Sequence, residues 1–401
     1  MSLLDLAARF DGFINRVTGI GIAGSDRSVG TRMESDPILT AQELADLFRF
    51  DPLSRKIVSI YPSEALRRGI GSSSDFVRRE LTRLSARVKI ERAATWGRLY
   101  GGGVIVMGIR DGRPCHEPLL PPPEGQRYRI DFLDDYDRRS VTREQSLEIV
   151  NGERVTGEAQ MLRINPPSGD QFWVHRSRCL IFGGATTGDQ ERLANAGWDD
   201  SILQCPYQVI LKFAAGHGAV GNMLTDAASS VFKIKGLIAA VTGNKEIAID
   251  RRLALLDLYR SVTRAIWLDA DGGEEFEKLS TDFTGVPDVL DRLANLVAAS
   301  TDIPVTILIG QAPAGLNATG EADTRSWYAR VESYREQNID PCVDRLLDLI
   351  EPGAAPSWPS LWTPTDQERA ATTKTVAETD AIYMADGVYT PEEIRQARGP
   401  R

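Results

Sequence analysis

The chain has 401 residues, of which 42% are hydrophobic and 26% are charged, and its formal net charge is −9 at neutral pH. This length and composition are typical of a soluble protein of about two or three domains, and no stretch approaches the roughly 20 apolar residues of a membrane-spanning helix. The acidic balance argues against tight duplex binding, because sequence-independent affinity for DNA comes mainly from lysine and arginine side chains that neutralise phosphates.

The first residues and the cysteines give no sign of secretion. The segment MSLLDLAARFDGF carries Asp5 within its apolar stretch and lacks the pattern of a signal peptide. We therefore expect the protein to stay in the cytoplasm in which it is made. The cysteines are widely separated and form neither a C-x-x-C pair nor a cluster with histidine. We expect reduced thiols at Cys115, Cys179, Cys205 and Cys342.

The N-terminal part is predicted to be mainly helical. A capping box, Thr40-Ala-Gln-Glu43, opens a helix that should end near Phe50. Residues 74–94 also have helical periodicity, with arginines on the polar face. Three of these arginines suit either a charged protein contact or simple solvation: Arg78, Arg79 and Arg83.

Strand patterns begin near Leu99. Residues 99–109 read LYGGGVIVMGI, which predicts a buried strand led by glycines. Three further short strands are expected at Tyr128–Phe132, Glu158–Ile164 and Arg178–Phe182. The adjacent glycines show no G-x-G-x-x-G spacing and no Walker A lysine, so close strand packing explains them better than a phosphate site. Helices and strands in this order predict an α+β fold.

The middle of the chain is predicted to contain two helices separated by β structure. Residues 201–230 are apolar at helical intervals, and residues 285–302 carry apolar groups on one helical face. Between them we expect a helix over residues 250–264 and a hairpin of strands 265–269 and 275–279. The hairpin turn contains Asp271 and Glu274, which lack the later ligands of a calcium loop.

An uncharged segment follows the second of these helices. Residues 303–320 combine prolines and glycines with short polar side chains, which predicts a polar loop between helices. Residues 321–350 then predict a long helix with a break at Pro341. A proline-rich linker over residues 352–364 should connect it to the end of the chain.

The C-terminal residues predict a small helical appendix. Thr365-Asp-Gln-Glu368 caps a helix that should run to about Met384 and end at Gly387. Thr390-Pro-Glu-Glu393 starts another helix, with proline at the first helical position.

Residues 303–321, IPVTILIGQAPAGLNATGE, together with Asp323, Trp327 and Tyr328, resemble the signature of tailed-phage portal proteins. The GLNATGE block is the specific part of the resemblance. Other segments follow in the same order as in that family: WGRLYGGGVIV at 96–106, VFKIKGL at 231–237, LSTDFTGVPDV at 279–289 and QNIDPCVDRLLDL at 337–349. The resemblance covers most of the chain.

The resemblance implies a portal fold that assembles as a ring. In that fold the chain divides into these parts: an N-terminal wing and body, 1–200; a first stem helix, 201–230; an αβ clip, 231–284; a second stem helix, 285–302; a channel (tunnel) loop, 303–320; a long wing helix, 321–351; and a linker with a short crown, 352–401. Because the crown is short, contacts with DNA inside the head do not follow from the resemblance.

The resemblance also implies a function without chemistry and without a cofactor. The subunit would form a homo-dodecameric channel at one capsid vertex of the virion, for packaging, retention and ejection of double-stranded DNA. It would be made in the host cytoplasm and would contact the major capsid protein. The terminase large subunit and later head-tail adaptor proteins would dock on the clip, near Asp271, Glu274 and Glu275.

In the family the channel loop touches DNA, which would bring Gln311, Asn317 and Thr319 to phosphate oxygens. Uncharged donors suit transient, non-specific contact, and an acidic wall suits sliding, although the net charge taken alone is better explained by solubility. The alternative for the loop is packing against the neighbouring subunit.

Two other functions are weighed against a portal. One is a different ring-forming adaptor protein of the virion. The other is a metal-dependent enzyme that uses Asp134, Asp135 and Asp137 with His175, although adjacent acidic residues in a loop more often form a solvated turn. The remaining histidines, His116 and His217, are too dispersed for a ligand motif.

Overall fold

The computed structural model describes residues 38–121, 127–144, 147–150, 153–156, 160–167, 169–226, 231–233, 275–277, 285–310, 321–363 and 366–397. Contacts divide the chain into Met1–Glu43 and Leu44–Arg401. The predicted first capping box is confirmed, because Thr40 N–H donates to Glu43 Oε2 (2.7 Å) and Glu43 N–H donates to Thr40 Oγ1 (3.2 Å). It opens helix α2, Ala41–Phe50.

Three helices follow α2: α3 (Pro52–Ala65), α4 (Asp75–Arg83) and α5 (Ala86–Tyr100). Asp51 caps α3 by accepting from the backbone N–H of Ser54 at 2.9 Å. The prediction of one continuous helix over residues 74–94 is wrong. Ser85 has a φ of 51°, a left-handed conformation that cannot continue a right-handed helix, and it separates α4 from α5.

A three-stranded antiparallel sheet in the order β3-β2-β9 lies against α5. Its strands are β2 (Gly102–Ile109), β3 (Ile130–Asp137) and β9 (Cys179–Gly183). The predicted glycine-led strand is therefore real but starts later than expected. Leu99 and Tyr100 belong to α5, which ends at Gly101 because that residue has a φ of 80°.

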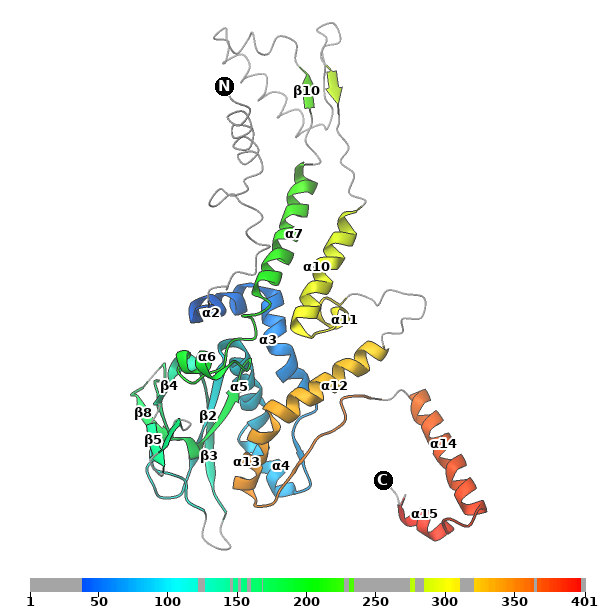
Figure 1. Ribbon diagram of the computed structural model, residues 1–401. Coiled ribbons are helices and arrows are strands. Elements are labelled where there is room, and N and C mark those ends of the chain that lie inside the picture. The colour runs from blue at the N-terminus through cyan, green and yellow to red at the C-terminus, as the bar shows by residue number, and fades with distance from the viewer. Residues whose placement is uncertain are drawn as a thin grey trace. The chain divides into compact units, whose positions relative to one another are not determined.

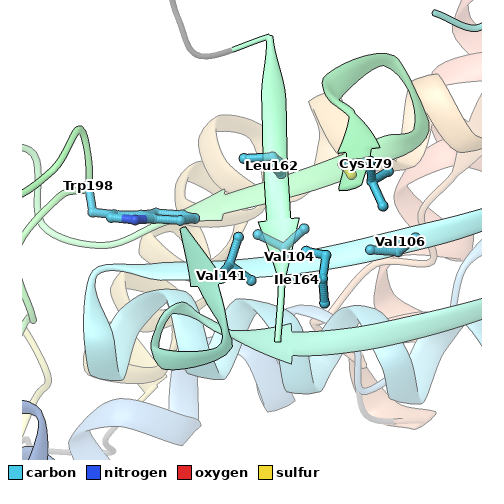
Figure 2. Packing of buried hydrophobic residues seen from close by; sticks show 8 residues of the cluster. Val104, Val106, Val141, Leu162, Ile164, Cys179 and Trp198 are labelled. Carbon is cyan, nitrogen blue, oxygen red and sulfur yellow. The ribbon is translucent and has the colours of Figure 1, made fainter. Parts of the chain in front are cut away.

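The rest of the β structure is short. A second sheet, in the order β4-β7-β8, contains Val141–Glu144, Met161–Ile164 and Phe172–His175. Two further described pairs are β5 (Leu147–Val150) with β6 (Glu153–Thr156), and β1 (Gly71–Ser72) with β12 (Pro356–Ser357). Figure 2 shows where the two larger sheets meet, with Val104 and Val106 of β2 facing Leu162 and Ile164 of β7. This contact forms one buried hydrophobic core, which Trp198 also joins.

Two long helices, α7 (Tyr207–Asp226) and α10 (Val286–Thr301), run side by side (Figure 1). Both predicted helices are therefore present, although the first begins at Tyr207 and not at residue 201. In sequence they flank β10 (Val231–Lys233) and β11 (Glu275–Glu277), which pair with each other. We predicted that residues 275–279 pair with 265–269, but the structure pairs residues 275–277 with β10. Residues 265–269 and the predicted helix 250–264 lie outside the described residues.

The predicted polar loop over residues 303–320 is partly wrong. Its first residues form a short helix, α11 (Val305–Leu308), and the side chains of Ile303 and Leu308 are buried. The apolar start of this segment is therefore part of the core. Residues 311–320 lie outside the described residues.

Helices form the remaining described structure. α6 spans Asp189–Ala194, and the predicted long helix is divided into α12 (Glu321–Asn338) and α13 (Asp340–Ile350), with Pro341 in the first turn of α13. The predicted break is thus confirmed. The C-terminal helices are α14 (Asp366–Ala385) and α15 (Pro391–Ala397). The predicted start of the last helix is confirmed, with Thr390 and Glu393 forming a capping box there. Thr365 of the predicted cap of α14 lies outside the described residues.

None of the described helices combines the length and the apolar character that crossing a membrane requires.

Candidate functional site

The residues predicted to contact DNA or a docking protein are mostly outside the described residues. This applies to Gln311, Asn317 and Thr319 of the loop and to Asp271 and Glu274 of the hairpin turn. Glu275 is described as the first residue of β11, where it pairs in register with Lys233 of β10. These roles remain predictions.

The acidic residues that were considered as metal ligands form ion pairs and hydrogen bonds within the protein, and they are not arranged as a metal site. Asp134, Asp135 and Asp137 lie on strand β3 and not on the expected loop. The Asp135 side chain is 2% exposed, and its carboxylate lies 3.0 Å from Lys89 Nζ and 3.2 Å from Arg92 Nε. Within the described ranges, no group of three or more histidine, cysteine, aspartate or glutamate residues is arranged to hold a metal ion.

The other members of the proposed metal set are also engaged locally. Asp137 caps a 3₁₀ helix by accepting from Arg139 N–H at 2.9 Å. His175 Nδ1 lies 2.8 Å from Ser177 Oγ. Burial lowers the pKa of His175, and the nearby cations Arg178 and Arg345 lower it further. This imidazole is therefore biased toward its neutral form as part of a turn.

The paired helices α7 and α10 are the most distinctive surface of the described chain. Between Tyr207 and Thr225, α7 carries a single charged residue, Lys212. Gly216 allows α10 to approach closely, because a Cβ built at that position would lie 2.8 Å from Leu293 Cδ1. The sequence thus gives α7 an apolar surface that is much larger than the contact with α10.

Most of that apolar surface remains uncovered. Ile210 of α7 and Ala294 and Val297 of α10 are buried. Four large apolar side chains of the pair are between 42% and 57% exposed: Leu211, Met223, Val289 and Leu296. An exposed apolar surface of this kind is typical of an interaction site.

The end of α10 is attached to the body by a polar joint at Asp302. Asp302 has a φ of 56°, and its backbone carbonyl accepts from Tyr61 Oη (3.0 Å) and from Arg330 (3.2 Å). The Asp302 carboxylate also accepts from Arg330, at 2.5 Å. The joint therefore ties α10 to α3 through Tyr61 and to α12 through Arg330.

The buried side chain of Arg98 packs against Tyr61 of this joint. Arg98 of α5 donates to the carbonyl oxygens of Val58 (2.9 Å) and Ile57 (3.1 Å), and its guanidinium lies 4.6 Å from the Tyr61 ring centroid and 5.2 Å from that of Tyr334. Burial lowers the pKa of Arg98 and raises the pKa of Tyr334 to about 12. The side chains of Arg98, Tyr61 and Tyr334 also line a pocket of about 380 Å³, which Asp302 lines as well. Sequence reasoning missed the joint, because its members are far apart along the chain.

A family model described as "Phage portal protein" matches residues 42–382. Among curated proteins, the chain is 27% identical over 391 residues to an "Anti-CBASS protein Acb1" of a Caulobacter species, covering 92% of this chain and 62% of the relative. A protein of the same name from Sphingomonas paeninsulae is 25% identical over 401 residues, covering 94% of this chain and 63% of the relative. The chain therefore spans about three fifths of the length of these relatives.

Among solved structures, the chain is similar to a chain from the neck of an empty GTA particle. The TM-score is 0.50 at 14% sequence identity, with 94% of this chain and 98% of the other covered. At that identity the likeness concerns the fold. The family match spans most of the chain and includes α7, α10, α12 and α13. The chain therefore belongs to the phage portal protein family.

Proposed function

We propose that this chain is the subunit of a homo-dodecameric portal ring at one capsid vertex. The observation that carries the proposal is the α7–α10 pair, which leaves Leu211, Met223, Val289 and Leu296 exposed. In a ring, the same pair in neighbouring copies would cover these side chains and form the wall of a channel. The proposed stem consists of residues 201–230 and 285–302, joined to the body at Asp302.

The proposed role of the channel is passage of double-stranded DNA during packaging, retention and ejection. Gln311, Asn317 and Thr319 of the loop would meet phosphate oxygens weakly, since uncharged donors form no ion pairs with the backbone. The net charge of −9 supports this proposal, because a strongly basic wall would hold the DNA. In this role the subunit is structural and carries out no reaction.

The other proposed contacts follow from family membership. Residues 231–284 would form the clip on which the terminase large subunit docks during packaging and head-tail adaptor proteins dock later, near Asp271, Glu274 and Glu275. Residues 1–200 and 321–351 would form the wing, which meets the major capsid protein. Residues 352–401 would form the short crown, and the subunit would reside at the portal vertex of the virion.

Native mass measurement of the purified full chain tests the ring. We expect a closed ring near twelve subunits with a central hole in negative-stain images. Leu296→Asp should raise the concentration needed for assembly by at least about tenfold, because it places a charge in an apolar interface. Leu193→Asp is the matched control, since Leu193 of α6 is similarly exposed (55%) but lies outside the helix pair.

A wild-type chain that stays monomeric or dimeric at high concentration would contradict the ring. A ring that Leu296→Asp leaves unchanged would show that the α7–α10 pair is not its interface. A ring that forms but does not bind the packaging motor would instead favour another ring-forming adaptor of the virion.

The name of the curated relatives raises a second function. We propose that the anti-CBASS activity in that name belongs to the part of those proteins that this chain does not match, since the matched part carries the portal family segment. Protection against CBASS defence by this chain alone, measured beside a full-length relative, would refute this assignment.

A further inference from the structure

The last two helices carry an apolar and aromatic patch around the turn that joins them. Five large side chains there are between 41% and 58% exposed: Ile382, Tyr383, Met384, Val388 and Tyr389. The rings of Tyr383 and Tyr389 are in edge contact, with centroids 5.8 Å apart. We call these five residues the C-terminal patch. No described residue of α14 is buried, so the two helices have no core of their own and present the patch outward.

Acidic residues surround the C-terminal patch. Residues 366–397 contain seven acidic and three basic residues, a net charge of −4. Asp386 lies in the turn between the helices, and Glu392 lies in the first turn of α15. A partner surface for this patch should therefore be basic and should accept aromatic rings.

Helix α4 of the same chain offers such a surface. Arg78 and Arg79 are exposed and, with Asp75 and Thr82, line a surface hollow of about 600 Å³. Arg78 pairs with Asp75, and Arg79 Nε donates to the neutral backbone carbonyl of Asp75 at 3.3 Å. We call Arg78, Arg79 and Thr82 the arginine face.

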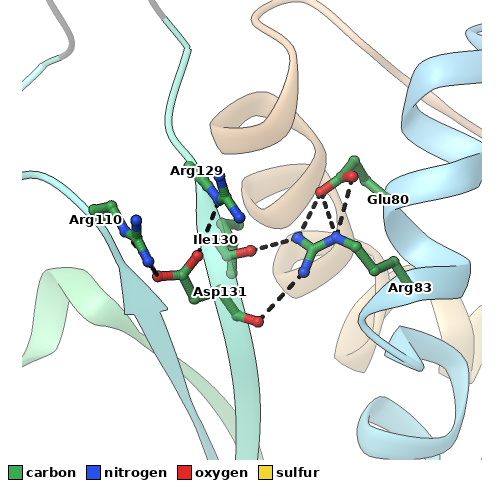
Figure 3. A network of polar contacts seen from close by, with 6 residues as sticks. All are labelled: Glu80, Arg83, Arg110, Arg129, Ile130 and Asp131. Carbon is green, nitrogen blue, oxygen red and sulfur yellow. Dashed lines mark hydrogen bonds and ion pairs between the residues drawn. The ribbon is translucent and has the colours of Figure 1, made fainter.

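The surroundings of the arginine face add positive charge. Arg83, Arg110 and Arg129 share the two carboxylates of Glu80 and Asp131 (Figure 3). Arg83 also donates to the backbone carbonyls of Ile130 and Asp131. Three guanidinium groups against two carboxylates give this network a net positive charge, and Arg83 of α4 connects it to the arginine face.

We propose that the C-terminal patch of one copy docks on the arginine face of a neighbouring copy, an inference that rests on the proposed ring. Tyr383 and Tyr389 would stack on the guanidinium groups, while Asp386 and Glu392 would pair with Arg78 and Arg79. The occupant is a second copy because one chain carries both complementary surfaces. Such a head-to-tail contact between unlike surfaces is the kind that generates closed rings.

Cross-linking between two differently marked chains tests the contact. In a background in which the exposed Cys115 and Cys205 are replaced by serine, one chain carries Val388→Cys and the other carries Thr82→Cys. After mixed assembly and mild oxidation, we expect a disulfide-linked heterodimer on a denaturing gel. Leu193→Cys in place of Val388→Cys is the control and should give no such product.

Charge reversal supplies a second readout. Arg78→Glu with Arg79→Glu should raise the chain concentration at half-assembly by at least about tenfold. Combining this pair with Asp386→Lys and Glu392→Lys should restore assembly, because the charges are exchanged across the contact. The control pair is Arg87→Glu with Arg113→Glu, two exposed arginines in local ion pairs on other segments, which should leave assembly unchanged.

The outcomes of these experiments distinguish a failure of the proposed contact from a failure of the proposed ring. The contact is wrong, and the ring proposal is retained, if three results come together. The wild-type chain forms rings, the cysteine variants give no disulfide-linked heterodimer, and charge reversal leaves assembly unchanged. A third variant carries Val388→Cys and Thr82→Cys in one chain. A disulfide that forms only within that chain also overturns the contact, since the patch then covers its own α4. A wild-type chain that never forms rings overturns both proposals.

Discussion

Replacing Asp111 by asparagine is expected to lower the free energy of unfolding by about 3 kcal/mol at neutral pH. The reason is the buried partner of Asp111. Arg178 is 2% exposed, and it forms two parallel hydrogen bonds to the Asp111 carboxylate, Nη1 to Oδ1 at 3.2 Å and Nη2 to Oδ2 at 2.6 Å. The variant leaves this guanidinium buried without its opposite charge, while the third contact, Arg178 Nε to the Glu117 carbonyl, remains.

The loss of stability should depend on pH. The hydrogen bonds from Arg178 hold the pKa of the Asp111 carboxyl below its ordinary value, so the folded state favours the ionised form. A carboxyl of this kind stabilises the fold above its unfolded pKa of about 3.9, and the stabilisation disappears as pH falls through the lower folded pKa. The difference between wild type and Asp111→Asn should therefore be constant near neutrality and should shrink below about pH 4.

Urea unfolding followed by tryptophan fluorescence, at one protein concentration and over a pH series, measures both effects. Asp75→Asn is the control, because Asp75 and Arg78 form an exposed ion pair with side chains 80% and 55% exposed. Such a pair contributes little, so the control should unfold at nearly the wild-type urea concentration. Equal effects of the two variants at neutral pH would show that the Asp111–Arg178 pair is not buried.

The elements predicted correctly are those whose signals are local. The helix starts predicted at Thr40–Glu43 and Thr390–Glu393 depend on residues at most three apart, and the structure has a capping box at each. The periodic apolar faces of α7 and α10 also predicted helices without knowledge of their partners. A local signal for α3 was present but not used, since Asp51 followed by Pro52 is a typical helix start.

The errors arise where distant residues decide the structure. Three acidic residues within four positions suggest a solvated turn, yet the strand pairing of β3 with β2 brings Asp135 to Lys89 and Arg92 of α5. The pairing of β11 with β10 joins residues more than 40 positions apart, which no hairpin rule anticipates. The joint at Asp302 likewise brings together α3, α10 and α12. Periodicity gives the faces of elements but not their neighbours.

Replacing Gly103 by alanine is expected to lower the free energy of unfolding by about 3 kcal/mol, and by valine to prevent stable folding. Gly103 is the third glycine of the run that led us to predict close packing. A Cβ at this position would lie 2.0 Å from the carbonyl oxygen of Ala93 and 3.0 Å from the backbone nitrogen of Gly97. Both atoms belong to the backbone of α5, so no side-chain rotation relieves the clash.

The effect should be specific to this helix–strand contact. Gly97 is the glycine that α5 contributes to the same contact, since a Cβ there would lie 2.5 Å from the carbonyl oxygen of Gly183 in β9. Helix α5 therefore rests on β2 and β9 through glycines of both elements, and an added methyl group must push the helix off the sheet. Gly285→Ala is the control, because no atom lies within 4 Å of its added Cβ.

Thermal unfolding of the three variants, followed by circular dichroism, distinguishes a clash between α5 and β2 from a general cost of replacing glycine. We expect Gly285→Ala to unfold near the wild-type temperature and Gly103→Ala to unfold well below it. If Gly103→Ala unfolds with the wild type, α5 does not lie directly on β2. If both alanine variants are equally destabilised, the loss reflects glycine replacement in general. The graded order of wild type, alanine and valine at Gly103 therefore identifies backbone contact, rather than backbone flexibility, as the reason for glycine at this position.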